Sequence, residues 1–154
     1  MAGRQGPFAG GRYPALIGCD EVGRGALAGP VVTAAVWFEP GRLPAALLAG
    51  LDDSKRLSPS RRAALAGELG EHADFEFGAG AVRVIDAGGI RDATLAAMAG
   101  ALGRLGRAGQ LAVDGRDLPD GWAGRTVIGG DGTVPQIAAA SILAKVLRDA
   151  LMAR

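Results

Sequence analysis

Apolar runs rich in β-branched and aromatic residues recur along the chain and predict five strands. Runs of this kind, bounded by Gly, Pro or acidic residues, are typical of buried strands. The five stretches are residues 15–19, 31–38, 74–85, 111–114 and 126–128. Only a short segment separates the first two stretches, so we expect them to pair as an antiparallel hairpin.

Three other stretches place apolar residues three and four positions apart, which is the spacing of an amphipathic helix. They cover residues 59–72, 91–107 and 133–152. Ser58 and Pro59 suit the start of the first helix, with Ser58 as its cap and Pro59 at its first position. Strands that alternate with helices predict an α/β fold. Because no repeat or low-complexity linker divides the chain, we expect a flexible leader over residues 1–14 and one domain over residues 15–154.

Composition narrows the class of protein without giving a function. The chain has 154 residues, of which 49% are hydrophobic and 21% charged, and this balance excludes a disordered protein. The net charge of +1 creates no overall field that would attract a polyanion. With Cys19 and His72 as the single cysteine and histidine, an internal disulfide and a structural zinc site are excluded. No apolar run is long enough to cross a bilayer, so we expect a cytoplasmic protein.

Acidic residues follow three of the predicted strands. Asp20 and Glu21 come after the first strand, Asp114 ends the fourth, and Asp131 follows the fifth. Because strand ends converge on one edge of an α/β sheet, we expect the four carboxylates to meet there. Carboxylates without His or thiolate ligands suit hard cations such as Mg²⁺ or Mn²⁺, and their crowding predicts a raised pKa for at least one of them without metal. Structural roles are the alternative: one of Asp20 and Glu21 could face solvent in a turn, and Asp131 could serve in a turn or as a helix cap.

The segment 23–28 also matches the dinucleotide-binding fingerprint with Ala in the last position. That fingerprint needs a helix to begin at the loop, whereas Pro30 and the β-branched residues 31–33 favour a strand. The two carboxylates before the loop would also repel a phosphate. A nucleotide-binding domain is therefore a weaker interpretation than a metal site.

The stretch Gly18–Val32, with the sequence GCDEVGRGALAGPVV, resembles the opening signature of the bacterial ribonuclease HII family. Five further matches occur in the order of the family: LDDSKRLS at 51–58, ID at 85–86 with IRDATLAAM at 90–98, VDG at 113–115, GD at 130–131 and IAAASILAK at 137–145. The resemblance covers about residues 15–152. It implies a ribonuclease H-like mixed sheet of five strands, three antiparallel and then two parallel, flanked by helices.

The resemblance also implies a chemistry. Family members cut the RNA strand of RNA/DNA hybrids and single ribonucleotides in duplex DNA, which is a step in ribonucleotide repair. The implied mechanism is hydrolysis with two Mg²⁺ or Mn²⁺ ions that leaves 5′-phosphate and 3′-hydroxyl ends. By match of motif, the catalytic and metal-binding acids are Asp20, Glu21, Asp114 and Asp131.

Four residues match family positions that contact the substrate. Gly23, Arg24 and Gly25 match the loop that contacts the ribose 2′-hydroxyl, the group that distinguishes RNA from DNA. Lys55 matches a position from which a lysine reaches a phosphate. Ordinary surface roles for Arg24 and Lys55 stay open. The expected partner is an RNA/DNA hybrid or DNA that contains ribonucleotides, and the expected state is a monomer.

Some features depart from the family pattern. Gly129 stands where the family often has Lys, and Gly89 stands where it often has Asn. The chain ends at Arg154 in the last matching helix, whereas family members usually continue with a segment that carries a tyrosine and basic residues. We therefore expect weaker substrate binding. The alternative function is a truncated, non-catalytic nucleic-acid-binding remnant of the same fold.

Other polar residues favour structural interpretations. Cys19 is expected in the core, and Asp52 and Asp53 are expected in a loop. Lys145 and Asp149 are four residues apart on the last helix and predict an exposed ion pair.

Overall fold

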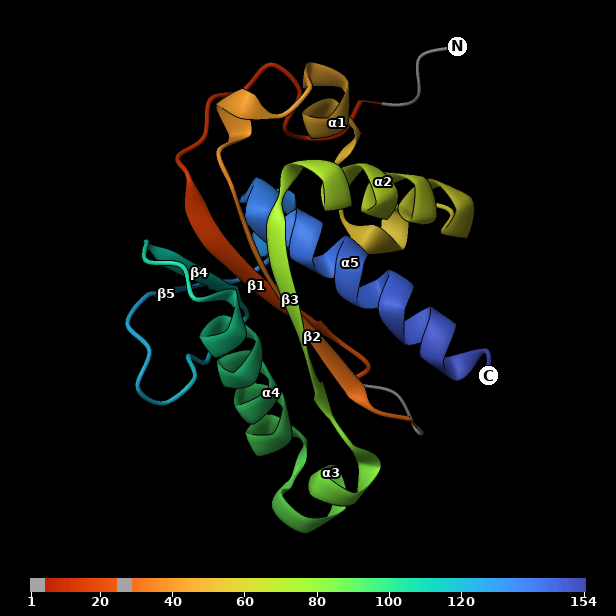
Figure 1. Ribbon diagram of the computed structural model, residues 1–154, viewed down its shortest axis with the longest axis vertical. Coiled ribbons are helices and arrows are strands. Elements are labelled where there is room, and N and C mark those ends of the chain that lie inside the picture. Colours follow the sequence, from red (N-terminus) through yellow and green to blue (C-terminus); the bar gives the residue numbers. More distant parts are fainter. Residues whose placement is uncertain (1–4, 25–28) are drawn as a thin grey trace.

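A mixed sheet of five strands forms the centre of the molecule (Figure 1). The computed structural model describes residues 5–24 and 29–154. The strands are β1 (Leu16–Val22), β2 (Val31–Phe38), β3 (Asp74–Gly80), β4 (Leu111–Asp114) and β5 (Arg125–Val127). They lie in the order β3-β2-β1-β4-β5, with antiparallel pairing among the first three and parallel pairing of β4 with β1 and β5. The predicted hairpin and the predicted mixed sheet are confirmed.

Five α-helices and three short 3₁₀ turns surround the sheet in the described part of the chain. The helices are α1 (Ala45–Gly50), α2 (Pro59–His72), α3 (Val82–Gly88), α4 (Ile90–Leu105) and α5 (Pro135–Met152). The turns are η1 (Pro40–Arg42), η2 (Ser54–Arg56) and η3 (Gly130–Gly132). Helix α2 has the predicted bounds, and the Arg61 amide donates a 3.1 Å hydrogen bond to Oγ of its cap, Ser58. None of the helices over the described residues is both long enough and apolar enough to span a membrane.

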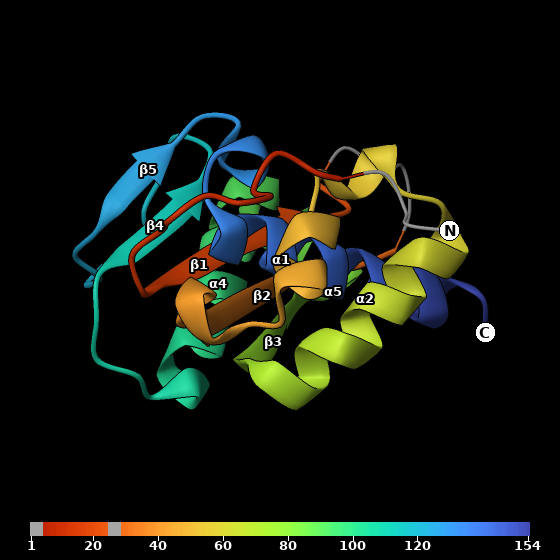
Figure 2. The same ribbon diagram turned by 90° about the horizontal axis from the view of Figure 1, so that it is seen from above.

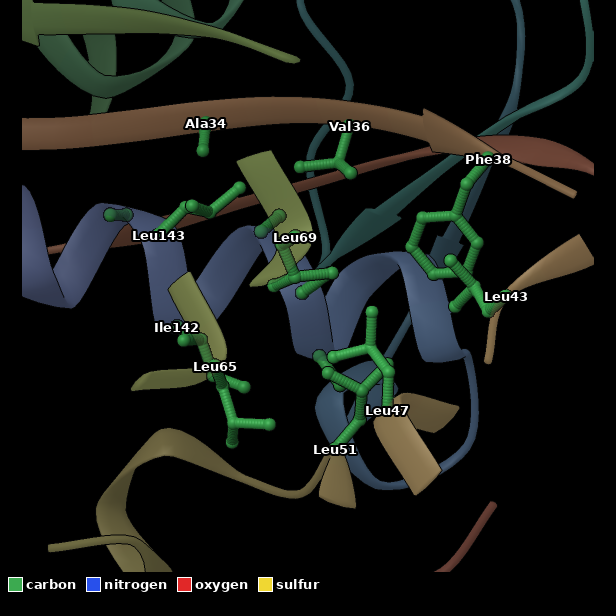
Figure 3. Packing of buried hydrophobic residues seen from close by; sticks show 14 of the residues in the cluster. Ala34, Val36, Phe38, Leu43, Leu47, Leu51, Leu65, Leu69, Ile142 and Leu143 are labelled. Carbon is green, nitrogen blue, oxygen red and sulfur yellow. The ribbon is translucent and has the colours of Figure 1, made fainter. Parts of the chain in front are cut away.

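Helices cover both faces of the sheet, because successive strand residues point to opposite faces (Figure 2). On one face, the even-numbered residues of β2 pack against α1, α2 and α5. Figure 3 shows this core, in which Val36 and Phe38 face leucines of the helices. On the other face, Cys19 is fully buried among residues that include Met98 and Leu102 of α4, as expected for that cysteine.

Gly18 allows α5 to lie directly on β1. A Cβ atom at this position would be 2.5 Å from the amide nitrogen of Ile137 and closer still to the carbonyl carbon of Gln136. Both atoms belong to the helix backbone, so neither can move aside without shifting α5. Asp20 is two residues further on the same face of the strand, and it is therefore set into the β1–α5 layer.

One strand boundary in the sequence analysis is wrong. The strand predicted over residues 74–85 ends at Gly80, and residues 82–88 form α3. Gly80 pairs with Val31, the first residue of β2, and Pro30 before it has no amide to continue the ladder. Residues after Gly80 thus have no partner strand on β2. The short helix α1 was not predicted.

Part of the N-terminal segment over residues 5–14 contacts the rest of the domain. Phe8 is 1% exposed, and its ring meets the ring of Tyr13 edge to face with centroids 5.5 Å apart. The Gly6 amide donates a hydrogen bond to the carbonyl of Ala49 at 2.6 Å. Burial of the Phe8 ring is the physical reason for this packing. Residues 1–4 lie outside the described residues.

Candidate metal centre

Three carboxylates meet where β1 and β4 end. Asp20 and Glu21 belong to β1, and Asp114 is the last residue of β4. Parallel pairing of Cys19 with Val113 brings these ends to one edge of the sheet. One oxygen atom from each of the three carboxylates lies within 4.8 Å of the others. The structure thus brings together three of the four acids that the sequence indicated.

Asp131, the fourth predicted acid, lies beside this group in η3. The amide of the preceding residue, Gly130, donates a 2.8 Å hydrogen bond to Oδ1 of Asp114, which ties η3 to the end of β4. Asp131 is also close enough to Asp20 and Asp114 for their charges to interact. All four predicted acids therefore lie on the same side of the molecule.

Burial and mutual repulsion make these acids resist ionisation. Burial raises the pKa of Asp20 well above its usual value, and the charges of Asp114, Glu21 and Asp131 raise it further. The pKa of Glu21 is raised by burial and by Asp114, while Arg24 opposes this shift. The expectation of at least one raised carboxyl pKa is confirmed.

The pKa of Asp131 is raised to about 6. Burial is the main cause, followed by the charges of Asp53 and Asp114, and a hydrogen bond to the Asp53 side chain adds to the shift. The positive charge of Lys55 acts in the opposite direction. The fourth acid thus interacts with a carboxylate and an ammonium group from the segment that contains η2.

The donor set fits a hard divalent cation. In the described residues, no salt bridge reaches Asp20, Glu21 or Asp114. Asp20 is 5% exposed, and its Oδ1 accepts a 2.8 Å hydrogen bond from the Glu21 amide. A buried carboxylate among other carboxylates is unfavourable unless a cation neutralises it. Oxygen-only ligands favour Mg²⁺ or Mn²⁺.

Two basic residues predicted to bind substrate flank the four acids. Arg24 is exposed, and its charge acts on Glu21. Lys55 is exposed in η2, and its charge acts on Asp131. Gly23 has φ +96°, a conformation that suits glycine, whereas Gly25 lies outside the described residues. Positive charges therefore act on two of the four acids, and the substrate-binding roles stay predictions.

Asp53, which is expected in a loop, lies beside Asp131, and this position was not predicted from the sequence. The carboxylate of Asp53 caps η2 by accepting a 3.0 Å hydrogen bond from the Lys55 amide, and it also lies against Asp131. A pocket of about 500 Å³ opens here, with Asp53, Arg56 and Asp131 in its lining. The motif Asp-Ser-Lys indicates a local turn. Nothing in that motif shows that the turn faces Asp131.

The expected ion pair on α5 is confirmed. Lys145 Nζ and Asp149 Oδ1 are 2.8 Å apart. Asp149 has a second partner in α2, because Nη2 of Arg62 lies 3.7 Å from its Oδ2.

The raised pKa values predict that metal affinity and metal-free stability both depend on pH. Each shifted acid binds its proton more tightly in the folded chain than in the unfolded chain, so the metal-free protein loses stability as pH rises through the folded pKa, which for Asp131 is about 6. Mg²⁺ binding displaces these protons, so its affinity should fall about tenfold per pH unit below the pKa for each proton displaced. Thermal unfolding in EDTA and in MgCl₂ between pH 5 and pH 8 measures both effects. A metal-free melting temperature that rises over this range would contradict the prediction.

Comparison with known proteins agrees with this geometry. The family model described as Ribonuclease HII matches residues 17–154. A ribonuclease HII of Xanthobacter autotrophicus is 48% identical over 148 residues, which are 95% of this chain and 57% of that protein. One of Paramagnetospirillum magneticum is 50% identical over 140 residues, which are 90% of this chain and 70% of that protein. The chain thus spans a little over half to about two thirds of these curated relatives.

A solved structure has the same fold. The structure described as the PCNA:RNase HII complex from Archaeoglobus fulgidus contains a chain that is 30% identical, with a TM-score of 0.77. The match covers 90% of the present chain and 73% of that one. The ribonuclease H-like fold expected from the sequence is confirmed.

Proposed function

Because the chain belongs to the ribonuclease HII family, we propose that it is a divalent-metal-dependent endonuclease that cleaves RNA in RNA/DNA hybrids and at single ribonucleotides in duplex DNA. The observation that carries the proposal is the meeting of Asp20, Glu21 and Asp114 within 4.8 Å at one edge of the sheet. The proposal includes 5′-phosphate and 3′-hydroxyl products, a role in ribonucleotide repair, and a cytoplasmic monomer. The buried thiol of Cys19 is compatible with a reducing compartment.

The acids of the chain would hold the cations. Asp20, Glu21 and Asp114 form the inner group, and Asp131 adds a carboxylate from η3. Bound Mg²⁺ or Mn²⁺ would supply Lewis-acid stabilisation of the phosphoryl group and activation of water for attack. Amide hydrogen bonds to Asp20 and Asp114 fix one oxygen of each carboxylate, which limits rotation of the side chains. Ligands held in this way lose less entropy when a cation binds.

The exposed cations would bind and orient the nucleic acid. A phosphodiester that approaches four carboxylates is repelled, so both the bound metal and nearby basic side chains are needed to hold it. Arg24, whose charge acts on Glu21, and Lys55, whose charge acts on Asp131, would contact phosphates of the bound strand. By match to the family loop, the backbone at Gly23 would contact the ribose 2′-hydroxyl.

A cleavage assay with matched duplexes tests the proposal. The substrates are a DNA duplex with one embedded ribonucleotide, an RNA/DNA hybrid and an all-DNA duplex of the same sequence, each with end labels that identify the products. We expect Mg²⁺- or Mn²⁺-dependent cleavage of the first two, 5′-phosphate ends, and no cleavage of the third. Cleavage that persists in excess EDTA would contradict the metal mechanism. Binding of the hybrid without turnover would instead support the non-catalytic alternative.

A further inference from the structure

We propose that Arg62 is a positioning residue that fixes the η2 turn, and with it the cations of Lys55 and Arg56, beside the metal centre. The inference rests on the proposed function, because it assigns these cations to substrate binding. Arg62 belongs to α2 and is outside the acid cluster. Its proposed effect on the reaction is exerted through η2.

Arg62 is bonded to both ends of the turn. The residue is only 8% exposed. Its Nη1 donates hydrogen bonds to the carbonyl of Ser54 at 2.9 Å and to the carbonyl of Leu57 at 2.6 Å. A buried guanidinium that donates to main-chain carbonyls forms strong, charge-assisted bonds. Removing the guanidinium would leave the buried Ser54 carbonyl without this donor.

A second buried contact ties the same turn to α5. The hydroxyls of Ser54 and Ser141 are 2.8 Å apart, and both residues are buried. Besides the Asp53 cap, the turn has two backbone hydrogen bonds, from the Arg56 amide to the Asp53 carbonyl at 2.9 Å and from the Leu57 amide to the Ser54 carbonyl at 3.3 Å. A single 3₁₀ turn is weak by itself. The contacts with Arg62 and Ser141 therefore restrain its position, together with the packing of Leu57 against the core.

The restrained turn presents two exposed cations next to the fourth acid. Lys55 and Arg56 are exposed, whereas Ser54 is buried and Leu57 half-buried. The Lys55 charge acts on Asp131, and Arg56 lines the pocket that Asp131 also lines. Cations whose main chain is fixed lose less conformational freedom when they bind a phosphate. Loosening the turn should therefore weaken substrate binding more than it slows the chemical step.

Steady-state kinetics with the single-ribonucleotide duplex test this coupling. Arg62→Met should raise KM about tenfold, the equivalent of losing about 1.4 kcal/mol of binding, with kcat changed by less than about threefold. Arg62→Lys keeps a charged N–H donor group for the two carbonyls. It should therefore restore most of the substrate affinity that Arg62→Met loses. In the Lys55→Ala/Arg56→Ala background, Arg62→Met should raise KM by less than about twofold, because the cations it positions are gone. An equal increase in both backgrounds, or an effect on kcat alone, would overturn the proposal.

Hydrogen–deuterium exchange tests the same inference without substrate. The amides of Arg56 and Leu57 should exchange at least about tenfold faster in Arg62→Met than in the parent protein, since local opening is less costly. The matched control is Arg61→Met, which removes the same charge from the next position, where the guanidinium packs near Gly50. It should change neither exchange nor KM. Unchanged exchange in Arg62→Met would overturn the proposal.

Two further results separate the possible failures. If Arg62→Met does not fold, Arg62→Gln keeps a shorter, neutral donor in place of the guanidinium, and it should accelerate exchange at the same two amides; unchanged exchange there would overturn the proposal. If the parent protein cleaves no ribonucleotide substrate, the proposed function fails, while the exchange measurement still decides whether Arg62 fixes the turn.

Discussion

Asp20→Asn is expected to reduce cleavage of the single-ribonucleotide duplex at least about a thousandfold, because it removes a charged ligand from the proposed centre that would stabilise the transition state. Asn has nearly the same shape and can still accept the hydrogen bond from the Glu21 amide. The loss would therefore come from the missing charge and not from altered packing. Single-turnover rates with saturating Mg²⁺ and then with saturating Mn²⁺ measure it.

The same substitution should raise the melting temperature of the metal-free protein at pH 8. Burial and the neighbouring acids make ionised Asp20 unfavourable, and a neutral amide removes that cost. Mg²⁺ should stabilise the parent protein more than the variant, so the difference in melting temperature shrinks when metal is added. Asp120→Asn makes the same charge change on an exposed loop and should alter neither activity nor stability. Activity within tenfold of the parent in Asp20→Asn would refute the assignment of Asp20 as a metal ligand.

Gly18→Ala is expected to lower the free energy of unfolding by about 3 kcal/mol, which for a domain of this size lowers the melting temperature by roughly 6–12 °C. The added Cβ would be 2.5 Å from the Ile137 amide nitrogen, so α5 must move away from β1. Helix α5 also packs against α2 and β2, and its displacement disturbs the core on that whole face of the sheet. Urea denaturation of the metal-free protein gives the change directly.

Gly67→Ala is the matched control for the glycine substitution. Gly67 is in the interior of α2, it is exposed, and no atom lies within 4 Å of the position that a Cβ would take. Here alanine should stabilise the protein by about 0.5–1 kcal/mol, since glycine costs helix stability. If Gly18→Ala proved as harmless as Gly67→Ala, the close contact between β1 and α5 would not be as described.

Residues with a strong local signal could be placed from the sequence. Ser58 and Pro59 determine where α2 begins, because a cap and a proline act within one turn. The end of β3 at Gly80 could not be read in this way, since it depends on where the neighbouring strand begins. The β-branched residues after Gly80 favour a strand locally, but no partner on β2 exists for them.

In the candidate site too, residues with a local sequence signal could be predicted, whereas contacts between distant segments could not. Asp20, Glu21 and Asp114 follow apolar runs, so their place at strand ends could be predicted. The contacts of Asp53 with Asp131 and of Arg62 with the η2 turn join segments far apart in the chain. The sequence around a charged residue in a loop or on a helix does not identify such a partner, because the partner depends on how distant segments pack.

The parallel pairing of β1 with β4 also has a consequence for how the acid cluster forms during folding. Residues 17–19 pair with residues 111–113, so this register forms only after the intervening polypeptide has closed a long loop. The three antiparallel strands can associate earlier, yet at that stage only Asp20 and Glu21 would be in place. The complete acid cluster should therefore be among the last features gained on refolding, which makes metal binding a sensitive reporter of the fully folded population.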